Sequence, residues 1–129
     1  LAQSDFNVSA MDVQRAAIRS AQNNADLNKI TNCLFQRSDA QKAIESLVRD
    51  KARFDLVLLD PPRQGCKNII AALPDLGAEY ILYISCDPGT LARDLAQLSD
   101  GAYSIIKSRA VDMFPQTYHI ESITLLRRN

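Results

Sequence analysis

Short apolar segments alternate with amphipathic segments along this chain, and this alternation constrains the fold more than any other feature. The apolar segments have the length of buried strands and cover residues 7–11, 33–36, 54–59 and 80–85. The segments that follow them have the spacing of helices and cover residues 13–27, 40–49, 68–73 and 90–98. Such alternation is typical of an α/β fold in which helices cover both faces of a parallel sheet.

The C-terminal part of the chain departs from this alternation. Residues 103–111 and 121–126 have the character of two further strands, with no helix between them. We expect these two strands to form an antiparallel pair at the edge of the sheet. The prediction is therefore a Rossmann-like, mostly parallel sheet that ends in an antiparallel C-terminal strand pair.

Composition excludes several classes of protein. The chain has 129 residues, of which 47% are hydrophobic and 23% charged, as in a globular domain or a piece of one. Its longest apolar run, near residues 80–84, is far shorter than the roughly 20 residues of a membrane span. Three cysteines in unlike contexts indicate reduced thiols and a cytoplasmic protein, and a single histidine argues against a zinc site. We therefore expect neither a membrane partner nor a bound metal.

Net charge gives no support for nucleic-acid binding, because 15 basic residues balance 15 acidic ones. One basic cluster lies near the C-terminal strands and consists of Lys107, Arg109, Arg127 and Arg128. Solvated surface charge is the simpler interpretation of that cluster.

Polar or reactive residues recur where the predicted strands end. These residues are Asp12, Asp39, Asp60 and Cys86. In open α/β sheets, ligands bind outside the carboxyl ends of the strands. The recurrence therefore predicts a functional site along this edge.

Asp60 opens the first of three motifs, residues 60–65 (DPPRQG). Two prolines after a strand form a rigid, extended turn without backbone donors, which fixes the place of the preceding carboxylate. A turn without function is the alternative, although loops at this edge usually carry function. Arg63 follows the prolines, whereas amino-group methyltransferases have an aromatic residue there in an Asp-Pro-Pro-Tyr pattern.

The second motif, residues 84–91 (ISCDPGTL), places Cys86 between a strand and a helix that we expect to begin near Gly89 or Thr90. A helix N-terminus stabilises nearby anions and so favours a thiolate. Cys33 lies inside a strand, where an inert buried thiol is expected. The third motif, residues 112–121 (DMFPQTYHIE), joins the last two strands and contains the only histidine, His119, and the acid Glu121.

Together, the three motifs resemble those of the bacterial RNA uracil-5-methyltransferases, which act on ribosomal and transfer RNA. The resemblance runs from about Asn7 to the end of the chain. It implies the class I S-adenosylmethionine-dependent methyltransferase fold, S-adenosyl-L-methionine as cofactor and RNA as partner. Cys86 matches the nucleophile of that family, and Glu121 matches the general base that removes the C5 proton.

The resemblance also implies a cofactor site. Asp12 lies where this fold holds the ribose hydroxyls, Asp39 where an acid reaches the adenine amino group, and Asp60 at the edge of the cofactor and base pockets. Arg63 and His119 fall in motif positions, but the resemblance assigns them no step.

The chain departs from the family pattern at its start. The glycine-rich loop that follows the first strand of this fold has no counterpart, and the missing strand belongs between those ending at Asp12 and Asp60. We therefore expect residues 1–129 to be the C-terminal part of a catalytic domain, inactive in isolation. Either the two strands pair directly, or a neighbouring chain supplies partners, or residues outside this sequence fill the gap.

Two other functions compete with this interpretation. The chain could serve as an inactive module that contacts RNA or protein. It could also belong to a methyltransferase that acts on a carbon or nitrogen of another substrate. A covalent adduct between Cys86 and RNA containing 5-fluorouracil would exclude the latter, and measured cofactor binding would exclude the former.

Overall fold

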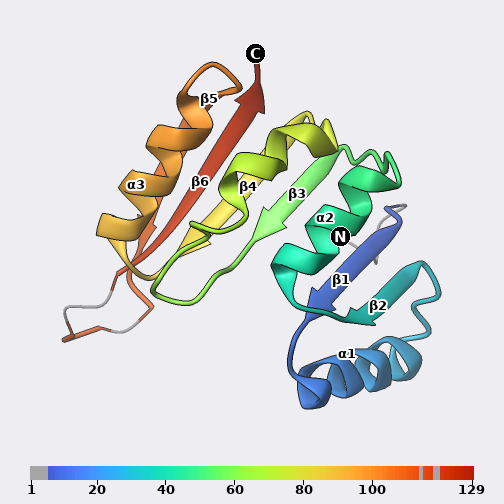
Figure 1. Ribbon diagram of the computed structural model, residues 1–129. Coiled ribbons are helices and arrows are strands. Elements are labelled where there is room, and N and C mark those ends of the chain that lie inside the picture. The colour runs from blue at the N-terminus through green and yellow to red at the C-terminus, as the bar shows by residue number, and fades with distance from the viewer. Residues whose placement is uncertain (1–5, 114, 118–119) are drawn as a thin grey trace. The chain divides into compact units, whose positions relative to one another are not determined.

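The computed structural model describes residues 6–113, 115–117 and 120–129. The chain forms two compact units, Leu1–Ser46 and Leu47–Asn129, and each is described by itself (Figure 1). No described helix has the length and apolar character needed to cross a membrane.

The N-terminal unit is built on two parallel strands. β1 (Val8–Asp12) pairs with β2 (Cys33–Arg37) in a register that places Val8 opposite Cys33 and Asp12 opposite Arg37. α1 (Arg15–Leu27) connects the strands and packs on both of them, burying Ile18 and Ala25 (Figure 1). α2 (Ala40–Arg49) follows β2 and runs across the boundary between the units.

The C-terminal unit contains a four-stranded sheet in the order β3-β4-β6-β5 (Figure 1). Its elements in chain order are β3 (Leu56–Leu59), the 3-10 helix η1 (Ile70–Leu76), β4 (Tyr80–Ser85), α3 (Pro88–Ser99), β5 (Tyr103–Val111) and β6 (Glu121–Arg128). β3 and β4 are parallel, and β6 runs antiparallel to both of its neighbours, β4 and β5. The predicted mixed sheet is confirmed, with the last strand inserted between β4 and β5.

One face of this sheet forms the core of the unit. Along β4, Ile81, Tyr83 and Ser85 are buried, whereas the residues between them are half-buried. α3 packs against η1 and β5. The core also includes the fully buried side chains of Ile70, Leu73, Leu98, Tyr103, Thr124 and Leu126.

Three helices differ by a few residues from their predicted bounds. α1 begins at Arg15 and not at residue 13. α3 begins at Pro88, next to the predicted start near Gly89 or Thr90, because the Asp87 side chain caps it and proline is tolerated at the first helical position. The helix expected over residues 68–73 is the 3-10 helix η1, shifted toward the C-terminus. It contains Pro74 and ends at Gly77, whose φ of 70° is left-handed.

Each strand that flanks the expected gap pairs within its own unit. In the described part of the chain, β1 pairs only with β2, and β3 pairs only with β4. Direct closure between residues 8–10 and residues 56–59, one of the outcomes considered from the sequence, would join the two units and stays a prediction.

Candidate active site

Cys86 lies directly after β4, in a segment that hydrogen bonds hold on both sides. The Ser85 hydroxyl donates to the backbone carbonyl oxygen of Asp87 at 3.0 Å and accepts from the Asp87 backbone N–H at 3.1 Å. Ser85 is buried and Cys86 is half-buried. A buried hydroxyl thus ties the residue before the thiol to the residue after it, which restricts the backbone of Cys86 itself.

Asp87 caps α3 directly after the thiol. Its carboxylate accepts the backbone N–H of Thr90 at 2.8 Å, and this hydrogen bond lowers the pKa of Asp87 below its usual value. Cys86 therefore precedes the cap of a helix of 12 residues. The position before a helix N-terminus, predicted from the sequence, is confirmed.

Glu121 is the first residue of β6, and the strand register brings it to the level of Cys86. Ser122 pairs with Ser85 across the antiparallel strands β6 and β4. Glu121 lies one residue before Ser122, and Cys86 lies one residue after Ser85. Both candidate catalytic residues therefore meet at the same end of two neighbouring strands, and both are half-buried.

Asp60 reaches the same edge of the sheet. Its predecessor Leu59 pairs with Tyr83 in the parallel strands β3 and β4, so β3 ends two residues short of the end of β4. Asp60 is exposed. The C-terminal unit thus brings together Asp60, Cys86 and Glu121, whereas His119 lies outside the described residues.

Three side chains of α3 that sequence reasoning missed hold the loop that begins at Asp60. The Thr90 hydroxyl donates to the carbonyl oxygen of Arg63 at 2.9 Å, and Arg93 Nη2 donates to that of Gln64 at 2.8 Å. Asp94 Oδ2 accepts the backbone N–H of Cys66 at 2.6 Å. The signal was present, because residues 90, 93 and 94 have the i, i+3, i+4 spacing of one helix face.

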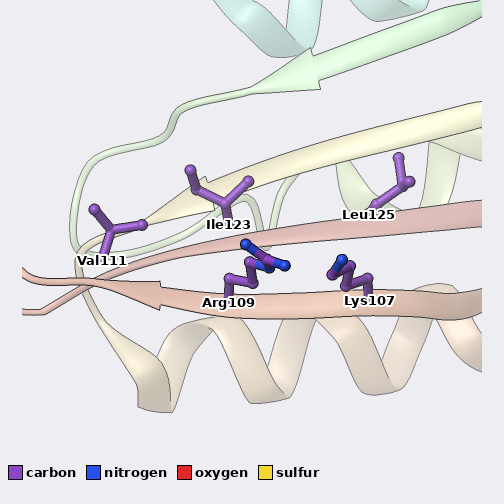
Figure 2. Close-up of a pocket in the computed structure, with 5 residues that line it drawn as sticks. All are labelled: Lys107, Arg109, Val111, Ile123 and Leu125. Atoms are coloured by element: carbon purple, nitrogen blue, oxygen red, sulfur yellow. The ribbon is translucent and has the colours of Figure 1, made fainter.

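A groove of about 330 Å³ lies on the face of the sheet that α3 does not cover (Figure 2). Its walls combine Lys107, Arg109 and Val111 of β5 with Ile123 and Leu125 of β6. Glu121 pairs with Val111 at one end of this row of cross-strand pairs, which places it on the same face as the groove. Two of the four basic residues noted in the sequence therefore lie beside apolar side chains, on the face that Glu121 shares.

The N-terminal unit places two carboxylates at the carboxyl ends of its strands. Asp12 ends β1 and accepts the backbone N–H of Gln14 at 2.6 Å. Asp39 follows β2 and accepts the backbone N–H groups of Gln41 and Lys42 at 3.0 and 3.3 Å. Both residues are exposed. A carboxylate has about four acceptor positions, so each can also accept a hydroxyl or amino donor of a nucleoside.

Comparisons with known proteins agree with this arrangement. The family model described as tRNA (uracil-5-)-methyltransferase matches residues 1–129. An RNA methyltransferase of Geobacter sulfurreducens is 46% identical over 120 residues, which are 92% of this chain and 24% of the relative. The 23S rRNA (uracil(1939)-C(5))-methyltransferase of Haemophilus parainfluenzae is 45% identical over 108 residues, or 84% of this chain and 25% of that enzyme. The chain thus spans about a quarter of the length of these curated relatives.

A solved structure supports both the fold and the family. The Pyrococcus abyssi tRNA (uracil-54, C5)-methyltransferase in complex with S-adenosyl-L-homocysteine superimposes with a TM-score of 0.80 at 33% identity, covering 97% of this chain and 30% of that enzyme. A methyltransferase of Agrobacterium tumefaciens shares the fold alone, with a TM-score of 0.77 at 13% identity. The predicted Rossmann-like methyltransferase fold is confirmed. As the three sequence motifs predicted, the chain belongs to the tRNA (uracil-5-)-methyltransferase family.

Proposed function

We propose that this chain is part of an enzyme that transfers a methyl group from S-adenosyl-L-methionine to C5 of a uridine in 23S rRNA or tRNA. The observation that carries the proposal is the register that brings Cys86 and Glu121 to one end of β4 and β6. A nucleophile and a base at one site are what this reaction requires. Family membership, and the substrates in the names of its relatives, support the choice of uracil in RNA.

Uracil C5 is a weak nucleophile, so Cys86 acts first. Its thiolate adds to C6, a bond forms between Sγ and C6, and the electrons of the C5–C6 double bond move toward C5 and the C4 carbonyl oxygen. S-adenosyl-L-methionine, when bound, supplies an electrophilic methyl group for C5. The carboxylate of Glu121 then accepts the proton from C5. The electron pair of the C–H bond restores the C5–C6 double bond and expels Cys86 as a thiolate.

Asp12 and Asp39 are the proposed contacts for the cofactor in the N-terminal unit. Their exposed carboxylates are acceptors, and the ribose hydroxyls and the adenine amino group are donors. Asp60 is the proposed acid at the edge between the cofactor and the target base. The uridine has to leave its stack so that Cys86 and the methyl donor can approach the ring.

We further propose that the chain works within a longer catalytic domain, in the cytoplasm. It spans about a quarter of its curated relatives. The face of the sheet shown in Figure 2 supports the longer domain, because Ile123 is 38% exposed there although α/β sheets are normally covered on both faces. Leu58 lies on the same face, since it pairs with Leu82 and Leu82 pairs with Leu125, and it is 47% exposed. "Full-length enzyme" below means these residues together with the further segments that such relatives contain.

The test uses the full-length enzyme and RNA in which 5-fluorouridine replaces uridine. Fluorine at C5 cannot leave as a proton does, so the adduct with Cys86 should persist through denaturing electrophoresis. Peptide mapping should locate the RNA on Cys86. An enzyme that methylates uridine and yet forms no such adduct would contradict the proposed mechanism.

A further inference from the structure

The loop that follows β3 depends on α3 for its conformation. Pro61 and Pro62 have no backbone N–H, so residues 60–62 offer few donors with which the loop could stabilise itself. A turn within the loop is closed by the hydrogen bond from the Gly65 N–H to the Pro62 carbonyl oxygen, at 2.9 Å. Further anchors come from Thr90, Arg93 and Asp94 of α3.

Asp94 is the centre of these anchors. Its side chain is 1% exposed, and its Oδ2 accepts both the Cys66 N–H at 2.6 Å and the Tyr83 hydroxyl at 2.7 Å. Its Oδ1 accepts Nε and Nη2 of Arg93 at 2.9 and 2.7 Å. A buried carboxylate is stable only when it is paired and hydrogen-bonded, and here both oxygens have partners. The carboxylate therefore joins β4, α3 and the loop at one point.

The backbone of the loop approaches Asp94 too closely for a side chain to stand between them. A Cβ on Gly65 would lie 2.5 Å from Asp94 Oδ2 and 2.8 Å from Arg93 Nη2. Gly65 also has a φ of 75°, a conformation that favours glycine. The loop is thus fitted against this carboxylate.

The same helix also fixes the nucleophile. α3 begins two residues after Cys86, and its cap Asp87 is tied to Ser85. α3 is therefore one rigid element that contacts both parts of the site. Cys86 lies just before its first turn, and the loop that begins at Asp60 is bonded to side chains of its first two turns. Any change that shifts the loop relative to α3 changes the place of Asp60 relative to Cys86.

We propose that Asp94 is a positioning residue for methyl transfer, which sets the loop of residues 60–65 against the nucleophile Cys86. The inference rests on the proposed function. Asp94 itself is buried beneath the loop. It acts through the Cys66 N–H and through Arg93, which donates to the Gln64 carbonyl oxygen. Thr90 is a second positioning residue on the same helix face, because its hydroxyl holds the Arg63 carbonyl oxygen.

The test compares Asp94→Asn with a destabilising control in the full-length enzyme. An asparagine at this position has one acceptor oxygen and one amino group, so it cannot accept from both Cys66 and Arg93. We expect kcat for methyl transfer and the rate of adduct formation with 5-fluorouridine RNA to fall by about 10- to 100-fold, as for a displacement of about 1 Å at a reacting centre. The Kd for S-adenosyl-L-homocysteine should stay within about twofold of the wild-type value, because Asp94 is proposed to affect the reaction step and not cofactor binding.

Tyr103→Phe is the matched control. It removes a buried hydroxyl that donates to the Ala78 carbonyl oxygen at 2.8 Å, far along the sheet from Cys86. It should therefore destabilise the fold while kcat stays unchanged. If Asp94→Asn acts only through stability, the two variants will lose activity in proportion to their loss of melting temperature, and the proposal is overturned.

Thr90 provides a second test that does not depend on the folding of Asp94→Asn. Thr90→Val removes the hydroxyl and keeps the shape of the side chain, whereas Thr90→Ser keeps the hydroxyl. We expect kcat to fall in the valine variant and to recover in the serine variant, and equal activity in both would overturn the role of the loop anchors. Failure of the proposed function can be told apart from failure of the Asp94 proposal. If the proposed function is wrong, the wild-type enzyme itself forms no adduct with 5-fluorouridine RNA.

Discussion

Cys86 and Glu121 each lie one residue beyond a cross-strand pair, that of Ser85 with Ser122. Residues that follow one strand and precede its antiparallel neighbour lie at the same edge of a sheet. Strand register therefore brings the proposed nucleophile and the proposed base to one edge, although they are 35 positions apart in the sequence numbering. This relationship leads to the first two predictions.

Replacing the nucleophile should separate chemistry from binding. In the full-length enzyme, Cys86→Ala should abolish methyl transfer, because it removes the thiolate whose addition to C6 makes C5 nucleophilic. Binding of S-adenosyl-L-homocysteine, measured by calorimetry, should be nearly unchanged. Cys33→Ala is the control, since Cys33 lies within β2 of the other unit and should leave activity intact. Full activity of Cys86→Ala would exclude the covalent mechanism.

Replacing the base should trap the reaction after methyl transfer. Glu121→Gln keeps the size of the side chain but cannot accept the C5 proton, so Cys86 cannot be expelled. We expect a covalent species of protein and methylated RNA that resists denaturation. Its amount is measured by denaturing electrophoresis with labelled RNA. Normal turnover without a trapped species would assign the proton transfer to another group, with His119 and Asp60 the next candidates.

The fold was largely predictable because its signals are local. Hydrophobic spacing predicted the exact bounds of α2, β4 and β5. The candidate residues Asp60 and Cys86 were predictable for the same reason, since each directly follows an apolar strand. The insertion of β6 between β4 and β5 was not predictable, because strand order depends on contacts between segments that are distant in the sequence.

The role of Asp94 was hidden by its helix. Leu91, Leu95 and Leu98 give α3 its apolar stripe, and Asp94 lies on the same face, where a lone acid gives no sign of its partners. Only the structure shows that it is buried and bonded to Cys66 and Tyr83. The placement of η1 was missed because Pro74 and Gly77 end an otherwise helical pattern in a 3-10 geometry.

Tyr83 should make the stability of the fold sensitive to alkaline pH. Burial raises the pKa of Tyr83 far above its usual value, and the hydrogen bond to Asp94 raises it further. A group whose pKa is higher in the folded state contributes stability that is complete below its unfolded pKa, about 10 for tyrosine. That stability is lost as the pH rises from there toward the folded pKa.

The measurement is urea unfolding of the full-length enzyme between pH 8 and pH 11. We expect the free energy of unfolding to fall above about pH 10, and to fall less steeply in Tyr83→Phe. Some dependence should remain in that variant, because burial also raises the pKa of Tyr103 and of the Cys66 thiol. Equal slopes in the two proteins would show that Tyr83 already ionises in the folded state.

The thiols should differ in reactivity according to burial. Cys66 is 7% exposed, and burial raises the pKa of its thiol, whereas Cys86 is half-buried at the edge of the sheet. In the native full-length enzyme, iodoacetamide should therefore modify Cys86 well before Cys66. Mass spectrometry of peptides taken over time measures both rates, and urea should make the two equal. Faster labelling of Cys66 would contradict its place beneath the loop.

Gly65 and Gly101 form a pair of positions that can isolate the contact between the loop and Asp94. Both have a positive φ, 75° and 89°, so alanine costs about 1–2 kcal/mol of backbone strain at either one. A Cβ on Gly101 meets nothing within 4 Å, whereas a Cβ on Gly65 lies 2.5 Å from Asp94 Oδ2. That oxygen belongs to a side chain held by Tyr83 and Arg93, so it cannot move away without breaking hydrogen bonds. Overpacking of this kind adds about 1–3 kcal/mol.

We therefore expect Gly65→Ala to lower the free energy of unfolding by about 2–5 kcal/mol, against about 1–2 kcal/mol for Gly101→Ala. Urea unfolding of the full-length enzyme measures both. At a temperature where both variants are folded, Gly65→Ala should also form the adduct with 5-fluorouridine RNA more slowly, because the displaced loop carries Asp60. Gly101 lies in the turn after α3, at the opposite end of that helix from Cys86, so its variant should react at the wild-type rate. Equal destabilisation by the two alanines would mean that the loop has room to move away from Asp94, and that the carboxylate does not set its position.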